Sequence, residues 1–193
     1  MRAVHVATER HRSSNPMKNR PMQLLLKPGM PVPALSFQTV GGEVWDVAKT
    51  APHTLDLVAV YRGVFCPYCR GFISELASRL DEFTHLGITT VAVSVDDEGR
   101  ARQAVEAWGL SRMAVGFGLS AELIRPWNVF LTTREQAGQT QTFCEPALLM
   151  VTPQKKVYAV LTQSIPAGRP DLANLLEGLA FLARQGFPIR GAA

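Results

Sequence analysis

The sequence predicts an α/β fold in which helices flank a mixed β-sheet. Two apolar, β-branched runs, Leu55–Tyr61 and Ile88–Val95, each predict a buried strand, and each is followed by a stretch with helical periodicity. Further along, Ala147–Val151 and Lys156–Leu161 flank a Thr-Pro-Gln-Lys turn and predict an antiparallel hairpin. Strand–helix units followed by a hairpin indicate a mixed sheet. A chain of 193 residues is long enough to bury the core of one such domain.

The chain before the first core strand divides into an extension and a hairpin. Residues 1–23 are basic and show no apolar pattern, so we expect a disordered extension there. Residues 24–193 then form a single domain. The segment Leu35–Val47 alternates apolar and polar residues around a Gly-Gly turn. This pattern predicts an N-terminal β-hairpin ahead of the main fold.

The remaining elements follow from periodicity and from start and stop signals. They are a helix from Pro67 that ends at Gly87, a helix at about 98–109, a short strand at Met113–Phe117, a helical turn capped by Ser120, a polar surface loop at Thr132–Thr142, and a last helix from Pro170 to about Arg184.

Three acidic residues, Asp96-Asp97-Glu98, connect the second core strand to its helix. Carboxylates of this kind could suggest a metal site. However, acidic residues at the start of a helix also complement the positive end of its dipole. We favour the dipole interpretation, and we expect no bound metal.

The first strand–helix junction carries the segment Tyr61-Arg-Gly-Val-Phe-Cys-Pro-Tyr-Cys-Arg70, with two of the three cysteines in a Cys-X-X-Cys spacing. Pro67 suits the first helical turn, where an N–H would have no partner. The unpaired N–H groups and the helix dipole at this end lower a thiol pKa from ~8.5 to roughly 3.5–7.5. We therefore expect Cys66 to be an exposed thiolate. Cys69, one turn below it, is close enough to form a disulfide.

Arg62 and Arg70 add positive potential to this segment, which holds no acidic residue, and the direct interpretation is a reversible dithiol–disulfide couple. Two alternatives are weaker. A structural zinc site needs a second Cys or His pair, whereas His85 and Cys144 each stand alone. A pair of buried cysteines acting as small hydrophobic residues fits poorly with the Pro, Tyr and Arg around them.

Composition argues against several other classes of function. The formal charge of +4 arises largely from the first twenty residues, with no basic stripe downstream, so we expect no nucleic-acid partner. No apolar run approaches 18 residues, and the first thirty residues lack the apolar core of a secretory signal. We expect no membrane association. Three cysteines in a chain of this length suit a reducing compartment, with the cytoplasm as the default.

These residues resemble a known superfamily. Cys-Pro-Tyr-Cys at a helix start is similar to the active site of thioredoxins and glutaredoxins. The wider segment Tyr61–Arg70, with the hairpin and Val93-Ser-Val-Asp-Asp97, resembles the peroxiredoxin-like branch, the alkyl hydroperoxide reductase/thiol-specific antioxidant family, over roughly residues 24–185. The resemblance implies a thioredoxin-like fold and a thiol oxidoreductase without a cofactor. Its substrates would be disulfides or hydroperoxides, and an external thiol system of the thioredoxin or glutathione type would reduce it.

The resemblance also implies roles for individual residues. Cys66 and Cys69 match the redox pair. Pro146 matches the cis-proline that faces the dithiol in thioredoxin folds, although an ordinary proline at a strand start gives the same sequence. Cys144 would then also lie near the site. The residues expected to shape the site around the redox pair are Pro146, Arg62, Pro67, Tyr68 and Glu145.

The sequence departs from the peroxiredoxin pattern Pro-x-x-x-Thr-x-x-Cys. Alignment places Arg62 at its proline, Cys66 at its threonine and Cys69 at its peroxidatic cysteine, while the family's arginine falls at Pro146. By resemblance to thioredoxins, the first cysteine of the motif, Cys66, would be the nucleophile. By alignment with peroxiredoxins, Cys69 would be the attacking sulfur. We favour Cys66, with Arg62 stabilising its thiolate and Cys69 as the resolving thiol. A non-catalytic thioredoxin-fold binding module is the alternative. The sequence does not indicate an oligomeric state.

Overall fold

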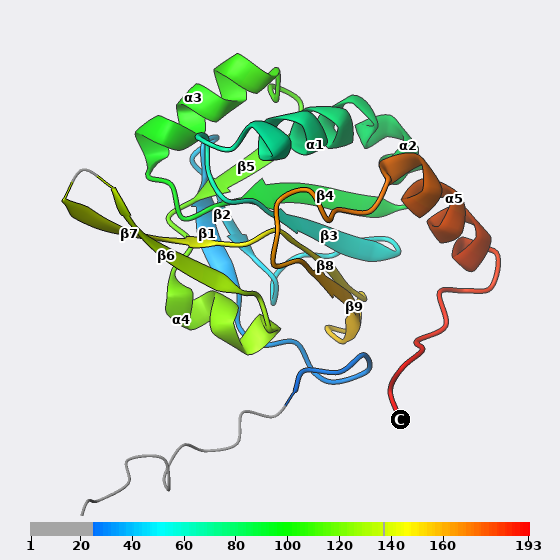
Figure 1. The fold of residues 1–193 in the computed structure, drawn as a ribbon. Coiled ribbons are helices and arrows are strands. Elements are labelled where there is room, and N and C mark those ends of the chain that lie inside the picture. The colour runs from blue at the N-terminus through cyan, green and yellow to red at the C-terminus, as the bar shows by residue number, and fades with distance from the viewer. Residues whose placement is uncertain (1–24, 137) are drawn as a thin grey trace, which may run out of the picture.

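A computed structural model describes residues 25–136 and 138–193 of the chain. It contains a seven-stranded mixed sheet in the order β2-β1-β5-β4-β3-β8-β9, and a separate two-stranded ribbon, β6-β7 (Figure 1). The strands are β1 (Ser36–Thr39), β2 (Val44–Asp46), β3 (Leu55–Val60), β4 (Ile88–Val93), β5 (Ala114–Phe117), β6 (Leu131–Gln136), β7 (Gln139–Cys144), β8 (Ala147–Val151) and β9 (Val157–Thr162).

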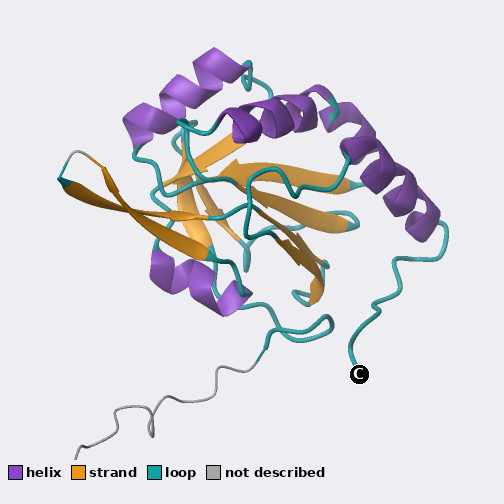
Figure 2. Cartoon of the chain, in the orientation of Figure 1, coloured by secondary structure: helices purple, strands orange, loops and turns teal. Residues whose placement is uncertain are grey.

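Helices cover both faces of the sheet, which gives the domain three layers (Figure 2). The helices are α1 (Pro67–Ser78), α2 (Leu80–His85), α3 (Glu98–Trp108), α4 (Ala121–Ile124) and α5 (Leu172–Ala183), with a single 3₁₀ turn at Arg125–Trp127. Side chains of α1, α2, α3 and α5 pack in one apolar cluster on one face, and those of α4 and the 3₁₀ turn pack on the other. None of the helices in residues 25–136 and 138–193 is both long and apolar enough to span a membrane.

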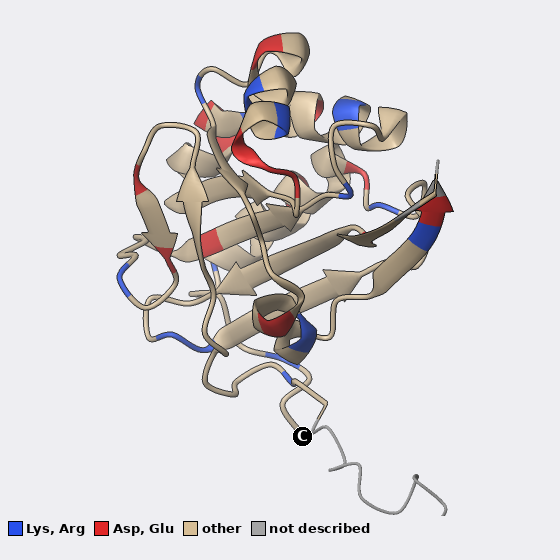
Figure 3. Ribbon diagram, turned by 90° about the vertical axis from the view of Figure 1, so that its left-hand side faces the viewer, with Lys and Arg blue, Asp and Glu red and all other residues tan. Residues whose placement is uncertain are grey.

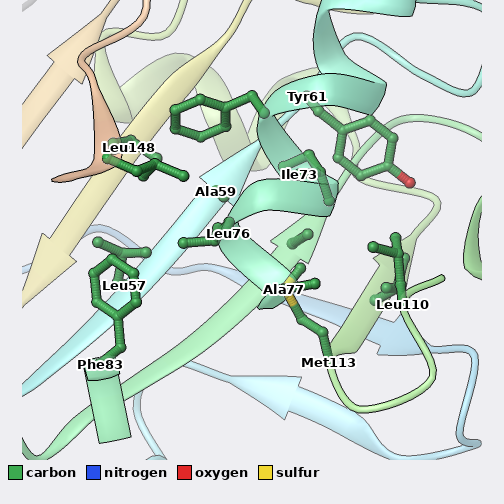
Figure 4. Close-up of a cluster of buried hydrophobic side chains, with 14 of the residues drawn as sticks. Leu57, Ala59, Tyr61, Ile73, Leu76, Ala77, Phe83, Leu110, Met113 and Leu148 are labelled. Carbon is green, nitrogen blue, oxygen red and sulfur yellow. The ribbon is translucent and has the colours of Figure 1, made fainter. Parts of the chain in front are cut away.

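Strand β3 is the centre of the sheet and runs into the Cys-X-X-Cys segment. It pairs in parallel with β4 and antiparallel with β8, and all six of its residues are buried. Its side chains alternate between the two layers. Leu57 and Ala59 pack with Ile73 and Leu76 of α1 (Figure 4), whereas Val58 lies in the opposite cluster. Charged residues accordingly lie mostly on helices, loops and the outer ribbon, with few on the central strands (Figure 3).

Most expected elements are present, and the predicted fold class is confirmed. The N-terminal hairpin forms from β1 and β2, and the β8–β9 hairpin forms as predicted. The helix predicted between Pro67 and Gly87 is divided into α1 and α2, because Arg79 leaves helical geometry (φ −102°, ψ 10°). The predicted disordered extension, residues 1–23, lies outside the described residues.

The prediction of a surface loop at Thr132–Thr142 is wrong. This segment forms most of β6 and β7, which pair antiparallel from Leu131–Cys144 to Gln136–Gln139. Threonine favours strands, and the Thr133 and Thr142 hydroxyls lie 3.0 Å apart across the ribbon. The ribbon projects from the body of the domain (Figure 1), so both of its faces tolerate polar residues. The alternation of apolar and polar residues that identifies a half-buried strand is therefore missing.

Gly116 of β5 offers a test of the packing between the N-terminal hairpin and the sheet. A Cβ atom at Gly116 would lie 2.3 Å from the Phe37 ring, which stacks on Trp45. We expect Gly116→Ala to lower the free energy of unfolding by about 1–3 kcal/mol, because the ring must move in a packed core. Chemical denaturation monitored by circular dichroism measures the change.

Gly178 provides the matched control for this substitution. It lies on the exposed face of α5, and a Cβ atom there would meet nothing within 4 Å. Gly178→Ala should raise the free energy of unfolding by roughly 0.5–1 kcal/mol, since alanine favours a helix interior. Equal effects of the two substitutions would contradict the proposed contact at Gly116.

Candidate active site

The dithiol lies where the chain leaves β3 and enters α1. Cys66 is the N-cap of α1, and its Sγ accepts a hydrogen bond from the Cys69 backbone N–H at 3.3 Å. Pro67 occupies the first helical turn, as the sequence predicted. An N-cap side chain normally supplies an oxygen to these unpaired N–H groups. Here a sulfur takes that place, so a negative charge on Cys66 is stabilised by the helix end.

The loop before Cys66 is fixed by a buried carboxylate. Asp96 accepts a hydrogen bond from the Val64 N–H at 2.7 Å and one from Arg100 Nε at 2.7 Å. Gly63 adopts φ 137°, and a Cβ atom there would lie 3.0 Å from both Asp96 oxygens. The next residue, Asp97, caps α3 by accepting from the Arg100 N–H at 2.9 Å. The helix-start interpretation of the acidic trio is confirmed for Asp97, while Asp96 holds the active-site loop.

Both sulfurs are buried, which corrects the expectation of an exposed Cys66. Cys66 is 1% exposed and Cys69 is 0% exposed, and both are free thiols. Tyr68, between them in sequence, is instead 60% exposed. The N-cap position turns the Cys66 side chain back over the first turn of α1 rather than into solvent. Neighbouring side chains, including Arg62, then cover it.

The two thiols have opposite electrostatic environments. A hydrogen bond from the Cys69 thiol lowers the pKa of Cys66 to about 6. The Cys69 backbone N–H and the Arg62 guanidinium act in the same direction, against burial. The same hydrogen bond, together with burial, raises the pKa of Cys69 well above its ordinary value. At neutral pH the pair therefore shares one proton, with the charge on Cys66 and the proton on Cys69.

Arg62 lies in a cluster of aromatic and charged side chains beside the dithiol. Its Nε is 3.5 Å from Glu145 Oε2, and its guanidinium lies 4.7 Å from the Phe143 ring centroid. Glu145 is itself buried and accepts a hydrogen bond from the Thr132 hydroxyl at 2.6 Å. Arg134 of β6 lies over the neighbouring Phe65 ring at 4.3 Å. The β6–β7 ribbon thus contacts the active-site loop directly.

Arg169 is a site residue that sequence reasoning missed. Its Nη2 donates a hydrogen bond to Cys69 Sγ at 3.1 Å, and its guanidinium lies 4.6 Å from the Phe72 ring centroid. It comes from the loop between β9 and α5, far from the dithiol in sequence. The only available signal was the resemblance, which requires an arginine near the sulfur. It could not indicate that this arginine would come from a loop rather than from the position of Pro146.

Pro146 lies beside the site, but the prediction of a cis bond is wrong. The next residue, Ala147, pairs with Val60, so Pro146 lies close to the end of β3. Among the described residues no peptide bond is cis. The chain continues as extended backbone from β7 into β8, with the Glu145 N–H bonded to the Phe130 carbonyl and the Pro146 carbonyl accepting from Gln163. A trans bond accommodates both hydrogen bonds.

Cys144 does not join the dithiol. It is fully buried in the apolar cluster on the opposite face of the sheet, and burial raises its pKa to about 12. In the part of the chain that the structure describes, no group of three or more His, Cys, Asp or Glu side chains is arranged to hold a metal ion.

The sequence and the fold are similar to those of known proteins. Residues 28–160 match the model of the AhpC/TSA family. No curated protein matches the sequence. Similar solved structures include a peroxiredoxin-like protein from Aquifex aeolicus, at 15% identity and TM-score 0.66, covering 81% of this chain and 88% of that one.

Two further structures extend the comparison. Peroxidoxin BcpB from Mycobacterium tuberculosis has 14% identity and TM-score 0.59 over 84% of this chain and 97% of that one. A thioredoxin family thiol:disulfide interchange protein from Chlorobium tepidum has 20% identity and TM-score 0.57, over 80% and 97% respectively. At these identities the likeness shows the fold alone, and that fold is thioredoxin-like.

The environments of the three cysteines predict an order of reactivity. Brief alkylation of the reduced protein with iodoacetamide should label Cys66 first, with a rate that rises with pH around a midpoint of about 6. The thiolate is the reactive form, so the rate follows its fraction. Peptide mass mapping across a pH series measures each site separately.

Cys144 is the internal control for this measurement, because its raised pKa keeps it protonated. In denaturant all three cysteines should label alike, with midpoints near ~8.5. Preferential labelling of Cys144 in the folded protein, or equal labelling of all three, would contradict the assignment of the thiolate to Cys66.

Proposed function

The chain belongs to the AhpC/TSA family, and on that premise we propose that it is a thiol oxidoreductase that cycles Cys66 and Cys69 between dithiol and disulfide. Its substrates are disulfides and hydroperoxides, and an external thiol system of the thioredoxin or glutathione type restores the dithiol. The observation that carries the proposal is the geometry of the dithiol, in which Cys66 Sγ caps α1 and accepts a hydrogen bond from the Cys69 backbone N–H at 3.3 Å. A thiolate at a helix N-terminus, hydrogen-bonded by a neighbouring thiol, provides a nucleophile and a resolving group together.

With a disulfide substrate, the reaction proceeds in two exchanges. The Cys66 thiolate attacks one substrate sulfur, the substrate S–S bond breaks, and one product leaves as a thiolate. The Cys69 thiol then gives up its proton and attacks Cys66 Sγ, which forms the internal disulfide and releases the second product. The proton passes to a product thiolate. Arg169, 3.1 Å from Cys69 Sγ, stabilises the negative charge as it develops on that sulfur.

With a hydroperoxide substrate, the Cys66 thiolate attacks the terminal oxygen and the O–O bond breaks. An alcohol leaves, taking one proton from solvent, and Cys66 becomes a sulfenic acid. Cys69 condenses with it to form the same disulfide and a water molecule. Arg62 and Arg169 flank the dithiol and supply positive charge where the oxygen becomes negative. Both routes therefore end in one oxidised state.

A non-catalytic binding module of the same fold is the second candidate, and the burial of both sulfurs favours it. An inert pair would neither titrate near pH ~6 nor form a disulfide with a redox buffer. We place the reaction in a reducing compartment such as the cytoplasm, since all three cysteines are free thiols and an external thiol must regenerate the pair.

Single cysteine variants separate the roles of the two sulfurs. Cys66→Ser should abolish reduction of a model disulfide, because the attacking thiolate at the N-cap of α1 is removed and burial still raises the pKa of Cys69. Cys69→Ser should instead accumulate a mixed disulfide on Cys66, since the resolving thiol is absent. Intact-protein mass spectrometry identifies the trapped adduct. Cys144→Ser, at a buried site on the opposite face, should retain activity and serves as the matched control.

Peroxide consumption tests the order of attack. Hydrogen peroxide should be reduced in a reaction that requires Cys66. Rapid peroxide consumption that survives Cys66→Ser and is lost in Cys69→Ser would overturn this order and assign the attacking sulfur to Cys69.

A further inference from the structure

The charges around the dithiol are unevenly matched. Within the described part of the chain, the dithiol and its neighbouring aromatic rings are contacted by three arginines, Arg62, Arg134 and Arg169. Two negative charges oppose them, the Glu145 carboxylate and the Cys66 thiolate, because the nearby Asp96 carboxylate is already paired with Arg100. One of these two charges depends on the redox state of the protein.

Glu145 interacts with the Arg62 side of this cluster and not with Arg169. It pairs with Arg62 at 3.5 Å and accepts from the Thr132 hydroxyl at 2.6 Å. Arg62 and Arg134 also share the faces of two aromatic rings, Phe65 and Phe143, which supply cation–π stabilisation. Arg169 is on the other side, with Cys69 and Phe72.

Arg169 depends on the sulfurs for its compensating charge. Its Nη2 donates to Cys69, whose thiol in turn donates to the Cys66 thiolate. Its Nε is buried and has no hydrogen-bond partner among the described residues. Burial lowers the pKa of Arg169, the two cysteines raise it, and the positive charge of Arg62 lowers it further. The thiolate is thus the anion that offsets this guanidinium.

Oxidation removes that anion. When a disulfide substrate oxidises the pair, the Cys66 thiolate and the Cys69 thiol form one S–S bond and give up two electrons and one proton. The substrate takes them and becomes a thiol and a thiolate. The two protein sulfurs are then neutral, so Arg169, whose Nε has no hydrogen-bond partner in the described dithiol form, faces a disulfide with no charge. An unpaired charge in a partly buried site is unfavourable.

We propose that the oxidised protein binds a small carboxylate at Arg169 and that the Cys66 thiolate excludes this anion from the reduced protein. The inference rests on the proposed function, because the disulfide of the catalytic cycle is the state that creates the site. A carboxylate matches the planar guanidinium, which can donate two parallel hydrogen bonds from Nε and Nη. Arg169 lies in the loop between β9 and α5 and its side chain as a whole is only partly buried, unlike either cysteine, but its Nε atom is buried, so a small anion must displace neighbouring side chains to reach that atom.

The site links carboxylate concentration to the redox couple. A ligand that binds only the oxidised form shifts the equilibrium toward the disulfide by the factor 1 + [L]/Kd. At a concentration ten times its dissociation constant, the carboxylate should raise the ratio of oxidised to reduced protein about tenfold. Carboxylates therefore make the dithiol a stronger reductant, without contact with either sulfur.

Acetate is the probe for this inference. The protein is equilibrated with uncharged dithiothreitol and its oxidised form at increasing acetate, with sodium chloride holding the ionic strength constant. Alkylation with a mass tag then measures the oxidised fraction. We expect the fraction to rise with acetate and not with acetamide, which has the same shape and no charge. Arg169→Gln should abolish the response, whereas Arg70→Gln, at an exposed arginine on α1, should retain it.

Thermal unfolding of Cys66→Ser tests the site without redox chemistry. This variant has lost the Cys66 thiolate, and burial still raises the pKa of Cys69, so acetate should raise its melting temperature even with reductant present, while the reduced wild type should not respond. Failure to form the disulfide, with acetate still stabilising Cys66→Ser, would reject the proposed function and keep the anion site. A disulfide that forms and cycles normally, with no acetate effect on either protein, would reject the anion site alone. A response that persists in Arg169→Gln would overturn the assignment to Arg169.

Discussion

The hydrogen bond that the Cys69 backbone N–H donates to Cys66 Sγ is the interaction on which the proposed chemistry of this protein depends. It forms because Cys66 takes the N-cap position of α1, where backbone N–H groups point at its sulfur. That position requires β3 to end at a fixed depth in the sheet and the loop after it to turn sharply. Asp96 holds the turn through Val64, and Gly63 provides the space for the carboxylate. A buried acid in the segment between β4 and α3 therefore supports the loop that positions Cys66.

The thioredoxin-like frame supports the dithiol with two arginines, of which Arg62 was predicted from the sequence and Arg169 was not. The family's arginine aligns with Pro146 in this chain. In the structure, Arg169 reaches Cys69 instead, from the loop after β9. The loop that carries Arg169 begins beside Pro146, because β8 and β9 form a hairpin and Gln163, which follows β9, donates a hydrogen bond to the Pro146 carbonyl. An arginine can therefore bring its positive charge to a sulfur either from the residue before β8 or from the loop after β9.

The parts of the fold with strong local signals could be predicted from sequence. Strands β3 and β4 are apolar and β-branched, the helices carry apolar stripes, and the Cys-Pro-Tyr-Cys motif marks a helix start. The β6–β7 ribbon could not be predicted in this way, because its half-buried side chains include the polar residues Thr132, Arg134 and Gln141, so no alternation of apolar and polar residues marks the strands. The burial of Cys66 and the role of Arg169 depend on tertiary contacts between distant segments, which local periodicity does not encode.

The burial of both sulfurs has a kinetic consequence that depends on the size of the reacting molecule. Hydrogen peroxide is close to water in size, so small side-chain movements admit it to Cys66. A protein disulfide needs the surrounding side chains to separate much further, and its apparent affinity falls by the fraction of molecules that are open. Two substrates of equal intrinsic reactivity would then be consumed at different rates. In the proposed reaction, access to the thiolate, as well as its nucleophilicity, would therefore decide between the two classes of substrate.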